Sequence, residues 1–569
     1  MPETEADSDR NNNTPISVDN NDVVPDGEMK TQKAEEQNRE ARKENIQGAA
    51  IQDPDQQSTE AEKTYEPENR QKQKRAPNLK LRAAVKIFFF FALTCILFLT
   101  LWGVTTYDSL NLSEIVFHLH LPFKGTGGGL VLKGALWTLI PSFFVTIFFG
   151  LLVWPLPGNF VPFAWYRDRK LKVRLARGLT LILIVIEVFL VQYYLDIVGF
   201  IRAEFTYTSF IEDNYVDPNQ VRLQAPPQKR NLVFIFLESM ESTYMSKEDG
   251  GMMENGRLEH LPLLAKENIN FSHHDLLGGF RSSVGTSWTV GAAFGAITGL
   301  PLKLPINVNG MSRIEEFFLG ATTLGDILKE DGYTNVLMTD CDSTFGGQAM
   351  LYDQHGDHLI LDLNWARKSG RIPKDYFVFW GFEDYKLFEF AREELSTLAA
   401  AGRPFSLTLF TMDTHFEDGH KCPKCPNKFK DKYSNVIACS DRLVTDFVRW
   451  IQEQDFYENT TIVVVGDHLT MDKDFMKEVP REERAVFNVF INAAATPVRT
   501  KNREFMATDL FPTTLAAMGY EIEGDRLGLG TNLFSGRKTL AEELGVEELD
   551  QRFKERSAFY ERKFLYNLE

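Results

Sequence analysis

The 569-residue sequence is long enough for several domains, and 43% of its residues are apolar while 25% are charged. Its formal net charge of −17 argues against a nucleic-acid-binding protein, which needs a basic surface to contact the phosphate backbone. These averages combine three regions of very different composition, residues 1–82, 83–201 and 202–569.

The first region, residues 1–82, has almost no aromatic or large apolar residues and is rich in Asn, Gln, Glu, Lys and Asp. Such a segment cannot bury enough apolar surface to offset the conformational entropy that folding would remove. The composition therefore predicts a disordered tail.

The second region, residues 83–201, contains three apolar stretches that can each cross a membrane. They lie roughly at 85–104, 130–154 and 179–201. A hydrocarbon core of about 30 Å takes about 20 helical residues to cross. A buried core helix is the alternative for one such stretch, but three so close together favour a membrane anchor. The third stretch contains Glu187 and Asp196, so we expect it to pack against its neighbours or to lie near an interface.

Basic residues indicate how the anchor is oriented. Lys and Arg cluster before the first stretch and again in the loop 155–178, whereas the loop 105–129 holds only Lys124. The positive-inside rule places the tail and the loop 155–178 in the cytoplasm. Three crossings then deliver residues 202–569 to the outside.

Four of the five cysteines fall in this third region, and three of them lie near one another in sequence. Cys422-Pro-Lys-Cys425, close to His420, is compatible with a small zinc site, but a fourth ligand is not obvious and one CxxC pair is a weak signal. An oxidising compartment favours a disulfide between Cys439 and either Cys422 or Cys425, which is the pairing we predict.

The third region alternates short apolar runs with longer helical stretches. The runs lie at 231–238, 334–340, 404–413, 460–468 and 485–492, and plausible helices at 313–330, 385–401, 435–454 and 508–518. Uninterrupted apolar runs of this length suggest strands that are covered on both faces, as in a parallel sheet. The alternation predicts an α/β sandwich, in which ligands gather at the carboxyl ends of the strands.

Polar residues end two of these runs. Glu238 follows the first, and Asp467 with His468 ends the fourth. Carboxylate and imidazole ligands at one edge of a sheet suit zinc or manganese. Each residue also has a purely structural interpretation, as a carboxylate near a helix start or a hydrogen-bonded turn pair.

Two further residues are candidates for chemistry. Thr286 lies in the glycine-rich segment 278–302 at the expected start of a helix, where its hydroxyl could cap that helix or act as a metal-activated nucleophile. His415 ends the run 404–412 at the same edge of the sheet, where it could donate to a phosphate oxygen or to a leaving group.

Four short motifs occur in an order that resembles the alkaline phosphatase/sulfatase superfamily. They are FLES at 236–239, VGTSWT at 284–289, DTH at 413–415 and GDH at 466–468. The chain is most similar to the branch with lipoteichoic acid synthases and periplasmic phosphoglycerol transferases, over essentially residues 202–535. The resemblance implies an alkaline phosphatase-like sandwich with a mostly parallel central sheet, preceded by three transmembrane helices.

The resemblance also implies a metal site and a covalent mechanism. Glu238, Thr286, Asp467 and His468 would bind one divalent metal, Mn²⁺ in preference to Mg²⁺ or Zn²⁺. Thr286 would form the covalent intermediate, and His415 matches a substrate-contacting histidine. The stretch 340–348, with Asp340, Gly346 and Gln348, departs from the lipoteichoic acid synthases, so headgroup contacts cannot be carried over.

The implied activity is transfer of phosphoglycerol from phosphatidylglycerol to a periplasmic glucan, by an inner-membrane enzyme whose catalytic domain is periplasmic. The alternatives are a lipoteichoic acid synthase-like or phosphoethanolamine transferase that uses another acceptor, and a receptor or scaffold that has lost catalysis. A sulfatase activity is disfavoured, because the sequence has no C-x-P-x-R motif from which formylglycine could be made.

Overall fold

The structure is a computed structural model. It describes residues 79–108, 112, 114–116, 128–154, 168–304 and 316–568. The chain divides into two compact units, 1–76 and 77–569, and all the described residues belong to the second. The predicted disordered tail therefore lies outside the described residues, except for 79–82, which already form the first turn of a helix.

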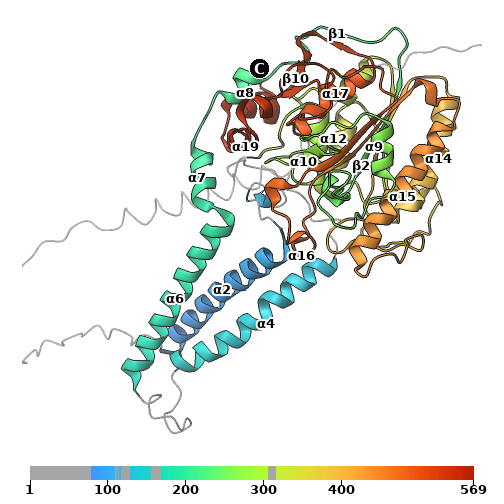
Figure 1. The fold of residues 1–569 in the computed structure, drawn as a ribbon. Coiled ribbons are helices and arrows are strands. Elements are labelled where there is room, and N and C mark those ends of the chain that lie inside the picture. The colour runs from blue at the N-terminus through green and yellow to red at the C-terminus, as the bar shows by residue number, and fades with distance from the viewer. Residues whose placement is uncertain are drawn as a thin grey trace, which may run out of the picture. The chain divides into compact units, whose positions relative to one another are not determined.

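Three helices, α2 (Leu79–Thr106), α4 (Gly128–Val153) and α6 (Arg169–Leu195), are long and apolar enough to cross a membrane, as predicted (Figure 1). Phe90 of α2 stacks on Phe149 of α4, with the ring centroids 3.8 Å apart. Glu187 on α6 is buried, in agreement with the expectation that this helix packs against its neighbours.

The third predicted span is wrong at both ends. Helix α6 begins ten residues earlier, because the carboxylate of Asp168 caps it by accepting hydrogen bonds from the amides of Lys170 and Leu171. It ends at Leu195, because Asp196 adopts a left-handed conformation with φ of 40°. A separate helix, α7 (Ile197–Phe205), then leads into the third region.

A seven-stranded sheet forms the centre of the third region, in the order β3-β8-β7-β2-β6-β4-β5. The strands are β2 (Asn231–Leu237), β3 (Gly279–Phe280), β4 (Thr334–Thr339), β5 (Leu359–Leu361), β6 (Phe405–Phe410), β7 (Thr460–Gly466) and β8 (Val486–Ile491). The five strands from β7 to β5 are parallel, whereas β8 and β3 join antiparallel. The prediction of a mostly parallel sheet is confirmed.

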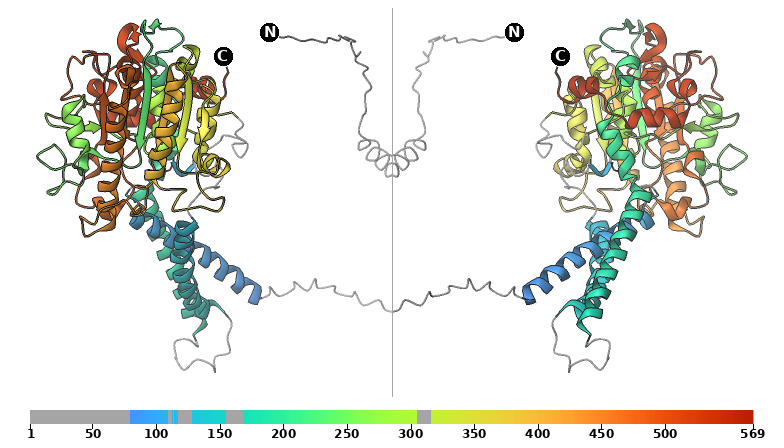
Figure 2. Two further views of the ribbon diagram at one scale, coloured as in Figure 1. Left: turned by 90° about the vertical axis from the view of Figure 1, so that its right-hand side faces the viewer. Right: turned by 90° about the vertical axis from the view of Figure 1, so that its left-hand side faces the viewer.

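Helices cover both faces of this sheet (Figure 2). The side chains of β2 alternate between two apolar clusters, Leu232, Phe234 and Phe236 in one and Val233, Ile235 and Leu237 in the other. The first cluster includes α10 (Thr289–Thr298) and α17 (Leu510–Ala517), and the second α9 (Leu261–Glu267), α14 (Asp384–Ala400) and α15 (Lys432–Gln452). The result is the predicted α/β sandwich.

Smaller elements complete the third region. They are α8 (Phe210–Asn214), α12 (Gln348–Gln354), α13 (Leu363–Lys368), α16 (Lys473–Met476), α18 (Leu540–Leu544), α19 (Val546–Lys554), α20 (Ala558–Tyr560), β1 (Leu223–Gln224), β9 (Glu521–Ile522), β10 (Arg526–Leu527) and β11 (Gly530–Thr531). The helix predicted at 313–330 is shorter, α11 (Leu324–Glu330), because Thr323 and Asp326 form a capping box that starts it there.

Candidate active site

Three of the predicted metal ligands meet at the carboxyl ends of two adjacent parallel strands. Glu238 directly follows β2, and Asp467 and His468 directly follow β7. Because Leu237 pairs with Gly466, these residues leave the sheet at the same level. One ligand atom of each lies within 4.8 Å of the others, and each residue is at most 2% exposed.

The orientation of the side chains leaves coordinating atoms free. The Nδ1 of His468 lies 2.9 Å from the Leu469 carbonyl and donates to it, so Nε2 carries a lone pair. That Nε2 is 3.6 Å from Glu238 Oε1 and 3.4 Å from Asp467 Oδ2. Asp467 Oδ2 is buried and has no hydrogen-bond partner among the described residues. Such an atom needs a cation, so the group fits a divalent metal.

The electrostatics of the site agree with this interpretation. Burial, and after it the neighbouring charge of Glu238, raise the pKa of Asp467 to about 7. Burial lowers the pKa of His468, but Asp467 and Glu238 outweigh that effect and raise it overall. The two carboxylates therefore favour a positive charge between them, supplied by a proton or by a metal ion.

Among the described residues, two hydroxyls donate to Glu238, that of the neighbouring Ser239 and that of Thr289, whereas the hydroxyl of Thr286 does not. Thr289 is the first residue of α10, and its Oγ1 donates to Glu238 Oε2 over 3.3 Å. Thr286 is 1% exposed, and its Oγ1 contacts Ser283 instead, at 3.3 Å from the amide, 3.0 Å from Oγ and 3.1 Å from the carbonyl. The structure thus brings Thr289 into contact with Glu238, whereas the predicted Thr286 lies one helical turn earlier, against Ser283.

The start of α10 explains this shift. Gly285 has φ of 80°, which favours glycine, and a Cβ there would come within 2.8 Å of Pro301. Trp288 is extended, with φ of −141° and ψ of 161°, so helical geometry begins only at Thr289. The free amides of the first turn then lie around the Thr289 hydroxyl, where they can bind an anion.

His415 lies in the loop after β6 and lines the same cavity as Thr289 and His468. Its Nδ1 is 2.8 Å from the Phe416 carbonyl, which leaves Nε2 for another partner. The imidazole packs against Trp380, with the ring centroids 4.5 Å apart. The structure therefore places His415 where the sequence expects it, at the edge of the sheet that holds the metal ligands.

The cavity has a volume of about 240 Å³ and is lined mainly by aromatic and apolar side chains. Its wall includes residues from the membrane anchor, Tyr107 and Glu114 from the segment after α2 and Leu130 from α4. The sequence offered no signal for these residues, because only the tertiary structure brings Tyr107 and Glu114 to the same cavity as Thr289, His415 and His468. Burial raises the pKa of Glu114 to about 7, although His468 and Arg481 lower it.

Residues of the stretch 340–348 differ in whether they line the cavity. Gly346 and Gln348 line the cavity. Asp340 is instead fully buried, and burial together with the neighbouring Asp384 raises its pKa well above the usual range.

A buried ion network joins the anchor to the two loops that carry the metal ligands. Asp108 accepts from Arg481 at 2.8 Å and from Arg484 at 2.7 Å. Arg484 is fully buried and also donates to Glu241, at 3.0 and 2.5 Å, and to the Thr470 carbonyl, at 3.0 Å. Glu241 is three residues after Glu238, and Thr470 is two residues after His468.

Replacing Arg484 with methionine is expected to lower the free energy of unfolding by about 3–5 kcal/mol, because Glu241 would stay buried without a partner. Arg481→Met is the matched control, since Arg481 also contacts Asp108 but its side chain is 34% exposed, and it should cost about 0–1 kcal/mol. Denaturant unfolding of both variants in detergent measures the difference. Equal losses would show that the buried network is not what stabilises this region.

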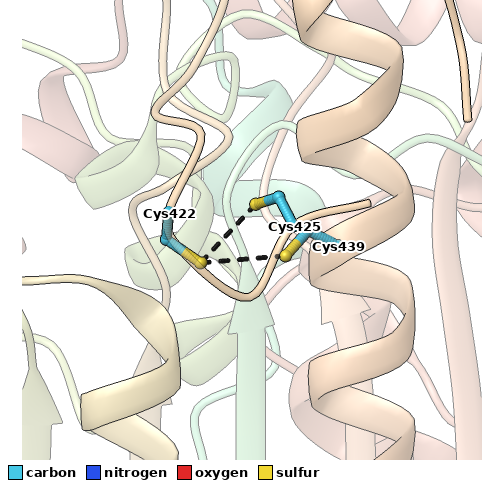
Figure 3. Close-up of side chains that lie close together, drawn as sticks. All are labelled: Cys422, Cys425 and Cys439. Carbon is cyan, nitrogen blue, oxygen red and sulfur yellow. Dashed lines mark hydrogen bonds between the residues drawn. The ribbon is translucent and has the colours of Figure 1, made fainter. Parts of the chain in front are cut away.

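The predicted disulfide is not formed in the structure, in which Cys422, Cys425 and Cys439 are free thiols. All three sulfur atoms nevertheless converge (Figure 3). The distances from Cys422 Sγ are 3.8 Å to Cys439 Sγ and 3.5 Å to Cys425 Sγ, well beyond the length of about 2.05 Å for a disulfide bond.

Comparison with known proteins reveals relatives over the region that holds the site. Phosphoglycerol transferase I of Xanthomonas campestris pv. campestris (strain B100) is 32% identical over 321 residues, which are 55% of this chain and 44% of the relative. Phosphoglycerol transferase I of Shigella flexneri is 29% identical over 342 residues, 59% of this chain and 42% of the relative. The match spans less than half of the length of either relative.

A solved structure of a protein in the alkaline phosphatase superfamily from Vibrio parahaemolyticus is similar over 60% of this chain and 79% of that chain, with 18% identity and a TM-score of 0.44. The family model described as Sulfatase matches residues 230–520, which is more than half of the chain and includes Glu238, Thr289, His415, Asp467 and His468. The chain belongs to the sulfatase family.

Proposed function

We propose that this protein is a membrane-anchored phosphotransferase that moves phosphoglycerol from phosphatidylglycerol to a periplasmic glucan. The observation that carries the proposal is the Thr289 hydroxyl, which lies beside Glu238 at a helix N-terminus and lines a cavity with His415 and His468. A hydroxyl in this setting is suited to form a phosphoester. The relatives named phosphoglycerol transferase I support the choice of group.

We propose Glu238, Asp467, His468 and the Thr289 hydroxyl as the ligands of one divalent metal ion, Mn²⁺ in preference to Mg²⁺ or Zn²⁺. Thr289 replaces Thr286 in this set, because Thr289 contacts Glu238 and is accessible from the cavity. Two carboxylates with one imidazole suit an ion of intermediate softness. When bound, such an ion lowers the pKa of a ligating hydroxyl and screens the charge of a phosphate.

The chain's own residues then carry out two displacements. In the first, the Thr289 hydroxyl gives up its proton as Oγ1 bonds to the phosphorus of the donor lipid, the bond from phosphorus to the diacylglycerol oxygen breaks, and that oxygen takes up a proton. In the second, an acceptor hydroxyl loses its proton and its oxygen bonds to the phosphorus. The bond from phosphorus to Thr289 Oγ1 breaks, and Oγ1 takes up a proton, which restores the Thr289 hydroxyl. Nε2 of His415 is positioned to carry the proton, and the amides at the start of α10 bind the phosphate oxygens.

The anchor supports a lipid as the donor. Tyr107, Glu114 and Leu130 bring the cavity wall directly onto the ends of α2 and α4. A lipid headgroup can then reach Thr289 while its acyl chains stay in the bilayer, so no lipid has to be extracted into water. The mostly apolar lining suits the glycerol backbone of such a lipid.

One observation favours a second candidate, a phosphoethanolamine transferase. The carboxylates of Glu114 and Asp342 line the cavity, and its described lining includes no lysine or arginine. An acidic wall can bind the ammonium group of ethanolamine. The same wall can also accept hydrogen bonds from the hydroxyls of a glycerol headgroup. A lipoteichoic acid synthase-like enzyme would share the donor and differ only in the acceptor.

Headgroup-labelled lipids decide between these candidates. The full-length protein in detergent is given labelled phosphatidylglycerol or phosphatidylethanolamine, with glucans or polyglycerol phosphate as acceptors, and the labelled product is identified by mass spectrometry. We expect label from phosphatidylglycerol on a glucan. Release of label only from phosphatidylethanolamine would replace the proposed donor, and no release from either lipid would contradict a lipid phosphotransferase.

The same proposal requires the catalytic region to lie on the outer side of the inner membrane. A reporter that is active only outside the cytoplasm, fused after Glu569, is expected to be active. The matched control is the same reporter inserted in the loop 155–178, which should be inactive because that loop is cytoplasmic by the positive-inside rule. The opposite pattern would contradict both the topology and access to the proposed acceptor.

A further inference from the structure

The cysteine cluster lies outside the active site, and its geometry is more specific than three nearby thiols. Cys422 and Cys425 lie in the loop before α15, and Cys439 is on α15 itself. Figure 3 shows the three side chains turned toward a common point, although they come from two separate segments of the chain. One sulfur from each lies within 4.8 Å of the other two.

The distances match those between ligands of a tetrahedral metal ion. Zinc binds thiolate sulfur at about 2.3 Å, so two sulfurs on one zinc ion are separated by about 3.8 Å. The observed separations from Cys422 Sγ, 3.8 Å to Cys439 and 3.5 Å to Cys425, agree with this value. They are too long for a disulfide, and a disulfide would use only two of the three sulfurs.

The backbone around Cys422 forms a turn that presents its sulfur as an acceptor. The Cys425 amide donates to the Cys422 carbonyl at 3.0 Å, and the Cys425 thiol donates to Cys422 Sγ at 3.5 Å. Cys422 Sγ is thus held as an acceptor, and cysteine binds metals as the thiolate. Cys422 and Cys439 are buried, whereas Cys425 is partly exposed, so the fourth position is accessible to solvent.

Basic residues surround the cluster and balance the negative charge of the thiolates. Lys421 and Lys424 flank Cys422 in sequence. Arg442, one helical turn after Cys439 on α15, donates to the Lys424 carbonyl at 2.8 Å. Three thiolates on one divalent cation leave one negative charge, which these cations offset.

We propose that Cys422, Cys425 and Cys439 bind a second metal ion, a zinc ion whose fourth ligand is a solvent molecule. This site is separate from the one formed by Glu238, Asp467 and His468, which has oxygen and nitrogen ligands. Soft thiolate ligands select zinc over the harder ions that suit carboxylates.

The proposed zinc ion would restrain the conformation of the loop that carries His415. That loop runs from the end of β6 to Cys425, and its backbone is already closed by the His420 amide, which donates to the Asp413 carbonyl at 2.6 Å. Linking Cys422 and Cys425 to α15 through a metal fixes the far end of the same loop. His415 is then held against Trp380 without itself contacting the zinc ion.

The proposal is tested by measuring the zinc content of the protein. The measurement uses the Asp467→Asn variant, which should lack the active-site metal, so that the zinc found belongs to the cysteine cluster. Full-length Asp467→Asn protein, purified from its native compartment without reductant, is expected to retain about one zinc ion per chain. Adding Cys425→Ser should remove that zinc ion. The matched control adds Cys95→Ser instead, a cysteine of α2 far from the cluster in sequence, and should leave zinc unchanged.

Two readouts keep the proposal testable if Cys425→Ser folds poorly. Cobalt exchanged into the Asp467→Asn protein should give thiolate-to-cobalt charge-transfer absorption, because Cys422, Cys425 and Cys439 form the group of described sulfur ligands that could hold a metal ion. Peptide mapping under non-reducing conditions should find all three thiols accessible to alkylation after chelation. A Cys439 disulfide in the purified protein, zinc content independent of Cys425, or absence of the cobalt band would each overturn the site.

Discussion

Replacing Thr289 with alanine is expected to reduce diacylglycerol release from phosphatidylglycerol by roughly 10³-fold or more, since nucleophile removal costs this much in enzymes that use a covalent intermediate. The reason is geometric, because Thr289 Oγ1 is the hydroxyl that contacts Glu238 and lines the cavity. Thr289→Ser keeps a hydroxyl in place and should retain measurable turnover. Labelled diacylglycerol, followed at matched folding and metal content, provides the measurement.

Thr286→Ala is the matched control, three residues away in the same segment. It removes the hydrogen bonds to Ser283 and should cost about 1 kcal/mol of stability, with turnover within a few-fold of the wild type. Incubation with phosphatidylglycerol and no acceptor should leave a phosphoglycerol group that peptide fragmentation assigns to Thr289. An adduct on Thr286, or near-normal turnover by Thr289→Ala, would restore Thr286 as the nucleophile.

Asp467→Asn is expected to have an effect of similar size, through the loss of the active-site metal. Asp467 Oδ2 is a buried carboxylate oxygen with no hydrogen-bond partner among the described residues, and an amide in its place offers a much weaker ligand for a cation. Divalent metal bound at this site should fall by about one ion per chain, and turnover by roughly 10³-fold. Metal analysis and the lipid assay measure the two effects separately.

Asp446→Asn is the matched control, because it makes the same chemical change at a side chain that is 58% exposed. It should alter neither the bound metal nor the turnover.

The wild-type enzyme should lose activity with a chelator and recover it with Mn²⁺. Its metal affinity should decrease as the pH falls below about 7, because burial raises the pKa of Asp467 to about 7 and protons then compete with the ion. Full turnover by metal-free enzyme would refute the proposed site.

The elements that the sequence predicted well are those with a local signal. Continuous apolar runs marked β2, β4, β6, β7 and β8, because a strand covered on both faces needs apolar side chains at every position. The polar residues that end β2 and β7 marked the edge of the sheet where Glu238, Asp467 and His468 meet. Both signals arise from neighbouring residues in the chain, which explains why no structure was needed to see them.

The direction of β8 and the start of α10 carried no such signal. An apolar run looks the same whether its strand is parallel or antiparallel, and β8 pairs antiparallel with β7. The sequence predicts the helix start at Thr286, whereas the backbone at Gly285 and Trp288 delays it to Thr289. Thr289 therefore lines the cavity, and Thr286 contacts Ser283 instead.

By itself the sequence determined the three apolar helices, the mostly parallel sheet and the three side chains that could hold a metal ion, since apolar length and strand ends are local properties. Only the tertiary structure decided which hydroxyl lies beside Glu238, that Tyr107 and Glu114 of the anchor line the cavity, and that three cysteine sulfurs converge. These are contacts between segments far apart in the chain, and they depend on how packed elements are oriented. No periodicity or spacing within one segment encodes that orientation.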